Sequence, residues 1–188
     1  MSLRLDTPRL VLREPEDSDA PALLAYGVRN EPRFARWEPE RADDVAHHLR
    51  WVRWRREESA AQRGVGLLAL DRAVPEAIVG VLNLYGITGS STYAAMLGYS
   101  IDGAYEGRGF AREAVGAVIA HAFDTLNLHR VIANYHPANE RSGALLRRLG
   151  FVVEGYSRDH LYLRGTWRDH ILTALTNPNW KPPPTERA

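Results

Sequence analysis

Two glycines and an alanine at the start of a helical pattern are the first sign of chemistry in this chain. The stretch runs Glu106-Gly107-Arg108-Gly109-Phe110-Ala111-Arg112 and leads into a long apolar periodicity. Small residues let backbone N–H groups approach a ligand closely, and the first N–H groups of a helix have no partner within it. Together with the positive end of the helix dipole, such groups favour a pyrophosphate, and nearby arginines can contact its oxygens.

Two common phosphate-binding motifs do not fit this loop. A dinucleotide-binding fold would need a third glycine, where the chain has Arg112, and would place the loop early in a parallel unit. A P-loop would need Gly-Lys-Ser or Gly-Lys-Thr, which does not follow. A plain turn between strand and helix remains, because glycine commonly marks such turns. The loop alone leaves an anion site and a plain turn equally open.

A second group of polar residues lies on the next helical pattern. Asn139 suits the N-cap of this helix. Ser142 precedes three leucines (Leu145, Leu146 and Leu149) by three, four and seven positions, which places its hydroxyl on their inward face. An inward hydroxyl needs a partner, either from the backbone or from a ligand.

Alternating strand and helix patterns must position these residues. We expect strands at 9–13, 65–71, 78–85, 93–101, 130–135, 151–163 and 167–175, and helices after 17 and at 41–58, 111–126 and 139–149. This order predicts an α/β (α+β) fold, with one mixed, mostly antiparallel twisted sheet of about seven strands and helices on both faces. We expect one domain over 1–180 and a flexible proline-rich tail over 181–188.

Composition narrows the class of protein. The 188 residues suit one domain, and 24 basic against 23 acidic residues give no general case for nucleic acid or an acidic membrane. The absence of cysteine excludes disulfides, thiolate catalysis and Cys-type zinc sites, and the histidines lack metal-ligand spacing, so no metal is expected. No apolar run approaches the roughly 20 residues of a membrane span, and the amino terminus does not read as a signal peptide. We expect a cytoplasmic protein of undefined oligomeric state.

Taken together, these segments resemble the GNAT superfamily of acetyl-CoA-dependent N-acetyltransferases. The loop fits the family pattern Gln/Arg-x-x-Gly-x-Gly/Ala, and the second helix fits Asn-x-x-Ser-x-x-Leu followed by Gly-Phe. One departure is Glu106, which stands where the family has Gln or Arg and is unfavourable beside a pyrophosphate unless it points away. Further matches indicate the ribosomal-protein-alanine N-acetyltransferase branch: Trp37-Glu38-Pro39, Leu97-Gly98-Tyr99-Ser100-Ile101, His129-Arg130, Ala133-Asn134-Tyr135, Arg141-Ser142-Gly143, Glu154-Gly155-Tyr156 and Trp167-Arg168-Asp169-His170.

The resemblance implies acetyl-CoA as the acetyl donor. In this family the pantetheine arm lies along the strand that here ends at Ile101, with backbone N–H groups near the thioester oxygen. Asn139 would bind the pantetheine amides, and Ser142 would give a proton to the departing thiolate, with Tyr135 as the weaker alternative. The expected cofactor-binding residues are Tyr99, Ser100, Ile101, Gly107, Arg108, Gly109, Ala111, Arg112, Asn139 and Ser142.

The acceptor side is less defined. An α-amine has an ordinary pKa of about 7.7–8.0, so it needs only a water and a nearby proton acceptor. Glu38 is the candidate catalytic acceptor or amine anchor, because its motif falls in the family's acceptor cleft; an exposed acid before a helix is the alternative. Asp159 is a second choice.

The resemblance favours the N-terminal α-amine of a ribosomal or similar protein as acceptor. A small amine such as an antibiotic, polyamine or amino acid stays open, as does an acyl-CoA-binding sensor without turnover. We expect His129 and His170 to be buried structural residues, and Tyr162 and Trp167 to belong to the core.

Overall fold

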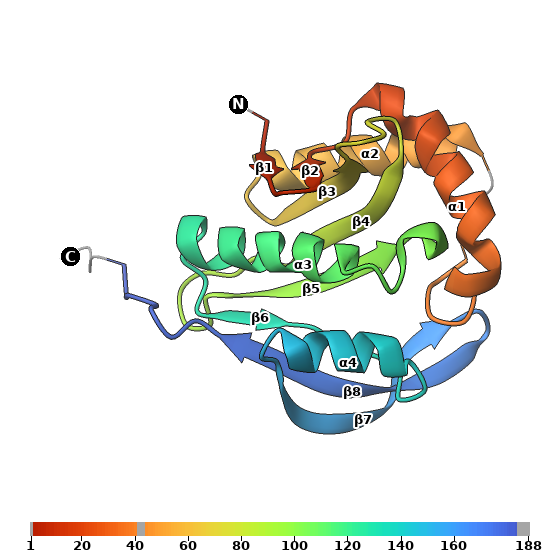
Figure 1. Ribbon diagram of the computed structural model, residues 1–188. Helices are drawn as coiled ribbons and strands as arrows, with labels where there is room; N and C mark the ends of the chain where they lie inside the picture. The colour runs from red at the N-terminus through yellow and green to blue at the C-terminus, as the bar shows by residue number, and fades with distance from the viewer. Residues whose placement is uncertain (1, 41–43, 184–188) are drawn as a thin grey trace.

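The computed structural model of the chain describes residues 2–40 and 44–183. Within these residues, one sheet holds eight strands in the order β1-β2-β3-β4-β5-β6-β8-β7 (Figure 1). The strands are β1 (Arg4–Asp6), β2 (Leu10–Arg13), β3 (Gly64–Asp71), β4 (Ile78–Tyr85), β5 (Ala94–Ile101), β6 (Arg130–Ile132), β7 (Val152–Leu163) and β8 (Thr166–Thr176). The α-helices are α1 (Ala20–Phe34), α2 (Val45–Ala60), α3 (Phe110–Ala120) and α4 (Glu140–Arg148).

Two hydrophobic cores lie on opposite faces of the sheet. Strand residues alternate between them, so that in β3 Leu67 packs with the α3 side and Leu68 with the α1 and α2 side, both fully buried. Figure 1 shows α3 and α4 covering one face, with α1 and α2 on the other. The predicted mixed sheet with helices on both faces is confirmed, and its strand number is eight because β1 has three residues and too short a pattern to recognise.

The sheet opens between β5 and β6, its one parallel pair among the described strands. Pairing covers only Ala94–Met96 of β5 and Arg130–Ile132 of β6. The expected strand at 130–135 therefore ends early, and Tyr135 instead makes an isolated antiparallel bridge to Ile171 of β8. Beyond Met96, β5 has no strand on that side in the described chain, so the edge of its last five residues is free to meet a ligand.

Two helices differ in extent from the prediction. The helix expected at 111–126 is α-helical to Ala120 and continues as a π-helix over His121–Thr125. The helix expected at 41–58 begins at Val45, because the side chain of Asp44 caps it by accepting the N–H of His47. Residues 41–43 lie outside the described residues. Val45, the first residue of the helix, is 41% exposed.

The chain end is described only in part. Residues 181–183 are exposed and belong to no helix or strand, and 184–188 of the predicted tail lie outside the described residues. The domain boundary at 180 stays a prediction. In the part of the chain that the structure covers, no helix combines the length and apolarity needed to cross a membrane.

Candidate functional site

A cavity of about 1650 Å³ lies beside the free edge of β5. Ligand pockets commonly measure about 300–1,000 Å³, so this one has room for two reacting molecules. Its walls come from β4, β5, the loop before α3, the start of α4, the segment after α1 and parts of α2. The structure brings most of the predicted site residues to its walls: Glu38, Tyr99, Ser100, Ile101, Gly107, Gly109, Ala111, Arg112, Asn139 and Ser142.

The glycine loop forms a cradle of backbone N–H groups. Gly107 and Gly109 have φ of +70° and +82°, a conformation that favours glycine. A Cβ built on Gly107 would meet nothing within 4 Å, so the space above it is open. The backbone N–H of Glu106 donates to a backbone carbonyl, and so does that of Glu113. The six N–H groups between them, at 107–112, have no backbone acceptor in the described residues. These features fit a pyrophosphate at the N-terminus of α3.

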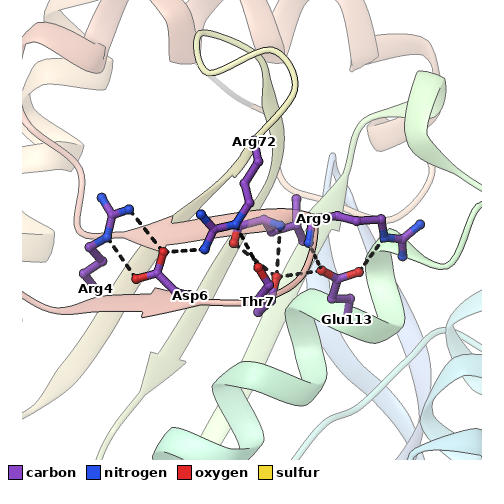
Figure 2. Close-up of polar contacts among 7 residues, drawn as sticks. Arg4, Asp6, Thr7, Arg9, Arg72 and Glu113 are labelled. Atoms are coloured by element: carbon purple, nitrogen blue, oxygen red, sulfur yellow. Dashed lines mark hydrogen bonds and ion pairs between the residues drawn. The ribbon is translucent and has the colours of Figure 1, made fainter.

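The turn between β1 and β2 holds this loop in place (Figure 2). Glu113, in the first turn of α3, accepts the Thr7 hydroxyl at 2.6 Å, the Arg9 backbone N–H at 2.7 Å and Arg9 Nε at 2.7 Å. Arg9 also donates to the carbonyl of Arg108 at 2.9 Å and lies 4.1 Å over the Phe110 ring. One arginine therefore joins the loop, the helix start and the strand turn.

Further contacts in the same region extend this network along β1. Arg72 donates to the Thr7 carbonyl at 2.8 Å and to Asp6, which also pairs with Arg4 (Figure 2). Burial alone would raise the pKa of Glu113, but the hydrogen bonds from Thr7 and Arg9 outweigh it and hold that pKa below its usual value. The carboxylate stays charged and also suits the positive end of α3.

The two loop arginines have different surroundings. Arg112 lines the cavity, as expected of a phosphate contact. Arg108 does not line it: its guanidinium lies over the rings of Tyr105 and Phe110, 5.5 and 5.2 Å from their centroids. The structure thus gives the Arg108 side chain an aromatic stacking position, and its backbone carbonyl the contact with Arg9.

Glu106 forms ion pairs with two arginines from different helices. It pairs with Arg33 of α1 and with Arg141 of α4, and its own side chain is 29% exposed. The acid that departs from the family pattern is therefore neutralised by protein cations, and it links α1 to α4 next to the loop.

Ser142 and Tyr99 meet on the α4 side of β5. The Ser142 hydroxyl lies 2.8 Å from the Tyr99 hydroxyl, and either oxygen can donate. Burial raises the pKa of Tyr99 to about 12, so its hydroxyl keeps its proton at neutral pH. Asn139 caps α4 by accepting the Ser142 N–H at 3.2 Å, which leaves its amide NH₂ to donate into the cavity.

Ser100 and Ile101, the next residues of β5, lie on the free edge of the strand. The Ser100 hydroxyl bonds to the Tyr26 hydroxyl of α1 at 3.0 Å, and Ile101 is buried. The backbone groups of these two residues are available as ligands along the free edge of β5, as the family pattern implies.

The opposite side of the cavity is aromatic. Trp37 and Glu38 follow α1 and line it, and the Glu38 carbonyl accepts from Arg164 Nε at 3.1 Å. The Trp37 ring lies 5.4 Å from that of His136, which lies 6.3 Å from that of His170. Both histidines line the cavity. Sequence patterns did not mark them as functional residues, because His136 and His170 are brought together only by the bridge between Tyr135 and Ile171.

Several expected side-chain positions are wrong. His129 is exposed, with its ring edge-on to Trp180 at 5.3 Å, whereas His170 is buried as expected. Tyr162 and Trp167 are 61% and 55% exposed and pack on each other at 5.4 Å, because they lie at the tip of the β7–β8 hairpin, away from both cores.

Two further observations concern the candidate proton acceptors and metals. Asp159 sits in an irregular part of β7, where its N–H donates to Asp169 at 2.9 Å, and it does not line the cavity. Throughout the described ranges, no three His, Asp or Glu side chains are grouped so that they could hold a metal ion.

Comparisons with known proteins agree with this geometry. Residues 9–152 match the Acetyltransferase (GNAT) domain family. The [Ribosomal protein uS5]-alanine N-acetyltransferase of Escherichia coli (strain K12) is 40% identical over 187 residues, covering 96% of this chain and 94% of that protein.

Solved structures extend the likeness to the fold. The ribosomal-protein-S5-alanine acetyltransferase of Vibrio fischeri has a TM-score of 0.89 at 33% identity, covering 96% of this chain and 100% of that one. Mycobacterium smegmatis RimJ, in complex with CoA-disulfide, has a TM-score of 0.84 at 27% identity, covering 93% and 86%. This chain belongs to the GNAT family of acetyltransferases, enzymes that take their acetyl group from acetyl-CoA.

Proposed function

We propose that this enzyme transfers an acetyl group from acetyl-CoA to the N-terminal α-amine of a ribosomal or similar protein, by direct attack of the amine on the thioester. The observation that carries the proposal is a single cavity that joins a pyrophosphate cradle to an aromatic acceptor side across the open edge of β5. The relatives named for uS5-alanine acetylation, one of them 40% identical over nearly the whole chain, support a protein N-terminus as acceptor.

The donor side is assigned to the groups that the glycine loop and α4 present. The N–H groups at 107–112 would bind the pyrophosphate with help from Arg112, and Asn139 would bind the pantetheine amides. The free edge of β5 from Tyr99 to Ile101 would pair with the pantetheine arm. Ser142, backed by the protonated hydroxyl of Tyr99, would give the thiolate its proton.

The acceptor side is assigned to the segment after α1. Glu38 lines the cavity there, and its carboxylate would anchor the incoming ammonium group. A protein N-terminus suits this chemistry because at pH 7 about a tenth of α-amines are already neutral, against fewer than about one in a thousand lysines.

An acceptor panel tests the proposal. Thiol release from acetyl-CoA would be followed with peptides that begin with Ala or Ser, with an N-terminally blocked copy that retains a lysine, and with polyamines, aminoglycosides and amino acids. We expect kcat/KM for the free N-terminus to exceed that for the blocked copy by about 300-fold, following their neutral amine fractions. Mass spectrometry should place the acetyl group on the first residue.

Each remaining outcome of the panel has a definite meaning. Turnover confined to small amines would overturn the protein acceptor while keeping the acetyltransferase. Tight CoA binding in calorimetry without turnover of any acceptor would favour the sensor.

A further inference from the structure

Three histidine rings form a row on the acceptor side of the cavity. His136 lies 6.3 Å from His170, and His160 lies 5.2 Å from His170, measured between ring centroids. His136 and His170 line the cavity, and His160 does not. His170 is therefore the central ring of the row, with one ring on its cavity side and one behind it.

The bridge between Tyr135 and Ile171 places this row opposite the donor side. Tyr135 packs against α4, where a Cβ on Gly143 would come within 2.7 Å of its ring, and Ile171 packs with the same core. Side chains alternate along extended chains, so the neighbours His136 and His170 point to the other face of the sheet. An amine held there and a thioester beside Ser142 would approach each other through the open edge of β5.

Hydrogen bonds fix the tautomer of His170. Its Nδ1 lies 3.2 Å from the carbonyl of Arg168, and a carbonyl oxygen can only accept, so Nδ1 carries the proton. In the neutral ring Nε2 then holds a lone pair, and no described residue bonds to it. His170 thus presents a proton acceptor on the cavity side of the sheet.

The neighbouring rings have other tautomers or other partners. His136 Nδ1 accepts the Ala138 N–H at 3.1 Å, so a neutral His136 carries its proton on Nε2 and acts as a donor. The Asn134 amide oxygen accepts the Thr173 N–H, which leaves its NH₂ to donate to His160 Nε2 at 3.4 Å. Of the two rings of this row that line the cavity, His170 is the one whose Nε2 can accept a proton.

The surroundings of His170 keep it neutral. Burial lowers its pKa from the ordinary value of 6.5, the bond to the Arg168 carbonyl opposes this, and the rings of His160 and His136 lower it further. Asp169, the next residue, has a weaker opposite effect. At pH 7 the ring is therefore uncharged and ready to accept a proton.

We propose that His170 is the general base of the acetyl transfer, with Nε2 accepting a proton from the acceptor amine. This inference rests on the proposed function but not on which amine is the acceptor. The amine nitrogen forms a bond to the acetyl carbon as the carbon–sulfur bond breaks. The acceptor ammonium first loses one proton to solvent, and as the neutral amine attacks, a second proton passes from its nitrogen to His170. The thiolate takes its proton from the Ser142–Tyr99 pair, and the proton on His170 returns to that pair through water.

The variant His170→Asn tests the proposal. Asparagine can imitate the Nδ1–H donor to the Arg168 carbonyl but has no group that replaces Nε2. We expect kcat to fall about 100-fold with acetyl-CoA affinity unchanged in calorimetry, and added imidazole to restore part of the rate. His129→Asn is the control, since it removes an exposed histidine that does not line the cavity, and it should keep the wild-type rate. A fall of less than threefold in His170→Asn would overturn the proposal.

The pH dependence of kcat/KM distinguishes a general base from a structural residue. It can be measured on the wild-type enzyme even if the variant does not fold. An acceptor whose amine carries electron-withdrawing substituents stays neutral from pH 5 to 8, so the acid limb of kcat/KM reports the enzyme. We expect the wild-type rate to fall at a pH below 6.5. This acid limb should persist in His129→Asn and vanish in His170→Asn. A flat wild-type profile would overturn the inference even if His170→Asn does not fold. Any amine that the enzyme acetylates can be used in this pH experiment. A wrong choice of acceptor class would therefore be detected by the acceptor panel and would not affect the pH profile.

Discussion

At the scale of single residues, the hydroxyl of Ser142 has its partner in place within the protein. Tyr99 lies 2.8 Å away and stays protonated because its pKa is raised to about 12. A thiolate is a weak base compared with an alkoxide, so it needs only one well-placed donor. The pair is suited to that task, since Tyr99 can pass a proton to Ser142 as Ser142 gives its own away.

Removing either hydroxyl should slow turnover more than it weakens binding. We expect Ser142→Ala to lower kcat about 10- to 100-fold and Tyr99→Phe to lower it by a smaller factor, because Ser142 alone can still draw a proton from water. Acetyl-CoA affinity measured by calorimetry should change little in both. A maximal rate of Ser142→Ala equal to that of the wild type would remove its role as donor.

Glu106 is compatible with a pyrophosphate because its charge is balanced within the protein. As an isolated acid it would repel a pyrophosphate, but it pairs with Arg33 and Arg141. Neither arginine is close to it in sequence, so the identity of its partners could not be predicted from local pattern.

At the scale of elements, the β1–β2 turn supports the start of α3. Glu113 accepts three hydrogen bonds from this turn (Figure 2). Arg9 also ties the turn to the Arg108 carbonyl in the loop. In the proposed function the loop binds the ligand through its backbone, so its shape must come from contacts outside itself. The N–H groups at 107–112 are positioned by residues roughly a hundred positions earlier in the chain.

Breaking this support should weaken cofactor binding from outside the cavity. We expect Glu113→Ala to destabilise the fold by about 2 kcal/mol, since it leaves charge-assisted donors unpaired. The same variant should raise the Kd for acetyl-CoA about fivefold, because the loop must then be ordered on binding. Calorimetry and thermal unfolding measure the two effects.

A remote ion pair provides the control for Glu113→Ala. Glu58→Ala breaks the pair with Arg63 between α2 and β3, far from the loop, and should leave the Kd unchanged. An unchanged Kd in Glu113→Ala as well would mean that the turn does not order the loop.

Element positions were largely predictable, and the exceptions have physical causes. The strands β3, β4 and β5 start within one residue of their expected positions, because continuous apolar runs end at turn residues. Gly150 closes α4 at φ +93°, as its position after the helical pattern indicates. The strand expected at 130–135 is short because where β6 leaves β5 depends on the tertiary fold, not on local preference.

At the scale of the whole molecule, the sheet separates the two reactants. The glycine loop and α4 present groups for the donor on one face, while Trp37, His136 and His170 lie towards the other. The gap between β5 and β6 connects the two sides. An opening inside the sheet thus suits a transfer between two substrates, because the two reactants can be held close to each other there.

The stability of the fold should depend on pH in two stages. Burial lowers the pKa of His121 and of His170 below 6.5, so the unfolded chain binds more protons as the pH falls through that value and the folded state loses stability. Burial opposes ionisation of Asp19, Asp102 and Glu113, but their hydrogen bonds outweigh it and lower each pKa. These carboxylates stabilise the fold above about pH 4, and this contribution is lost on further acidification.

Thermal unfolding from about pH 2 to pH 8 measures both stages. We expect Tm to fall between pH 7.5 and 5.5, by about 2–4 °C for each kcal/mol lost, and again below pH 4.5. His121→Gln should reduce the first decline, since a buried neutral amide has no proton to gain. A constant Tm between pH 5.5 and 7.5 would contradict the first stage.

The sequence by itself determined the positions of the residues proposed to bind the donor. The start of α3 places Gly107 and Gly109, and the first turn of α4 places Asn139 and Ser142, and short-range spacing encodes both. Only the tertiary structure decided the acceptor half. His136 and His170 come together because Tyr135 bridges to Ile171 of a distant strand, and that pairing follows from how the whole sheet assembles.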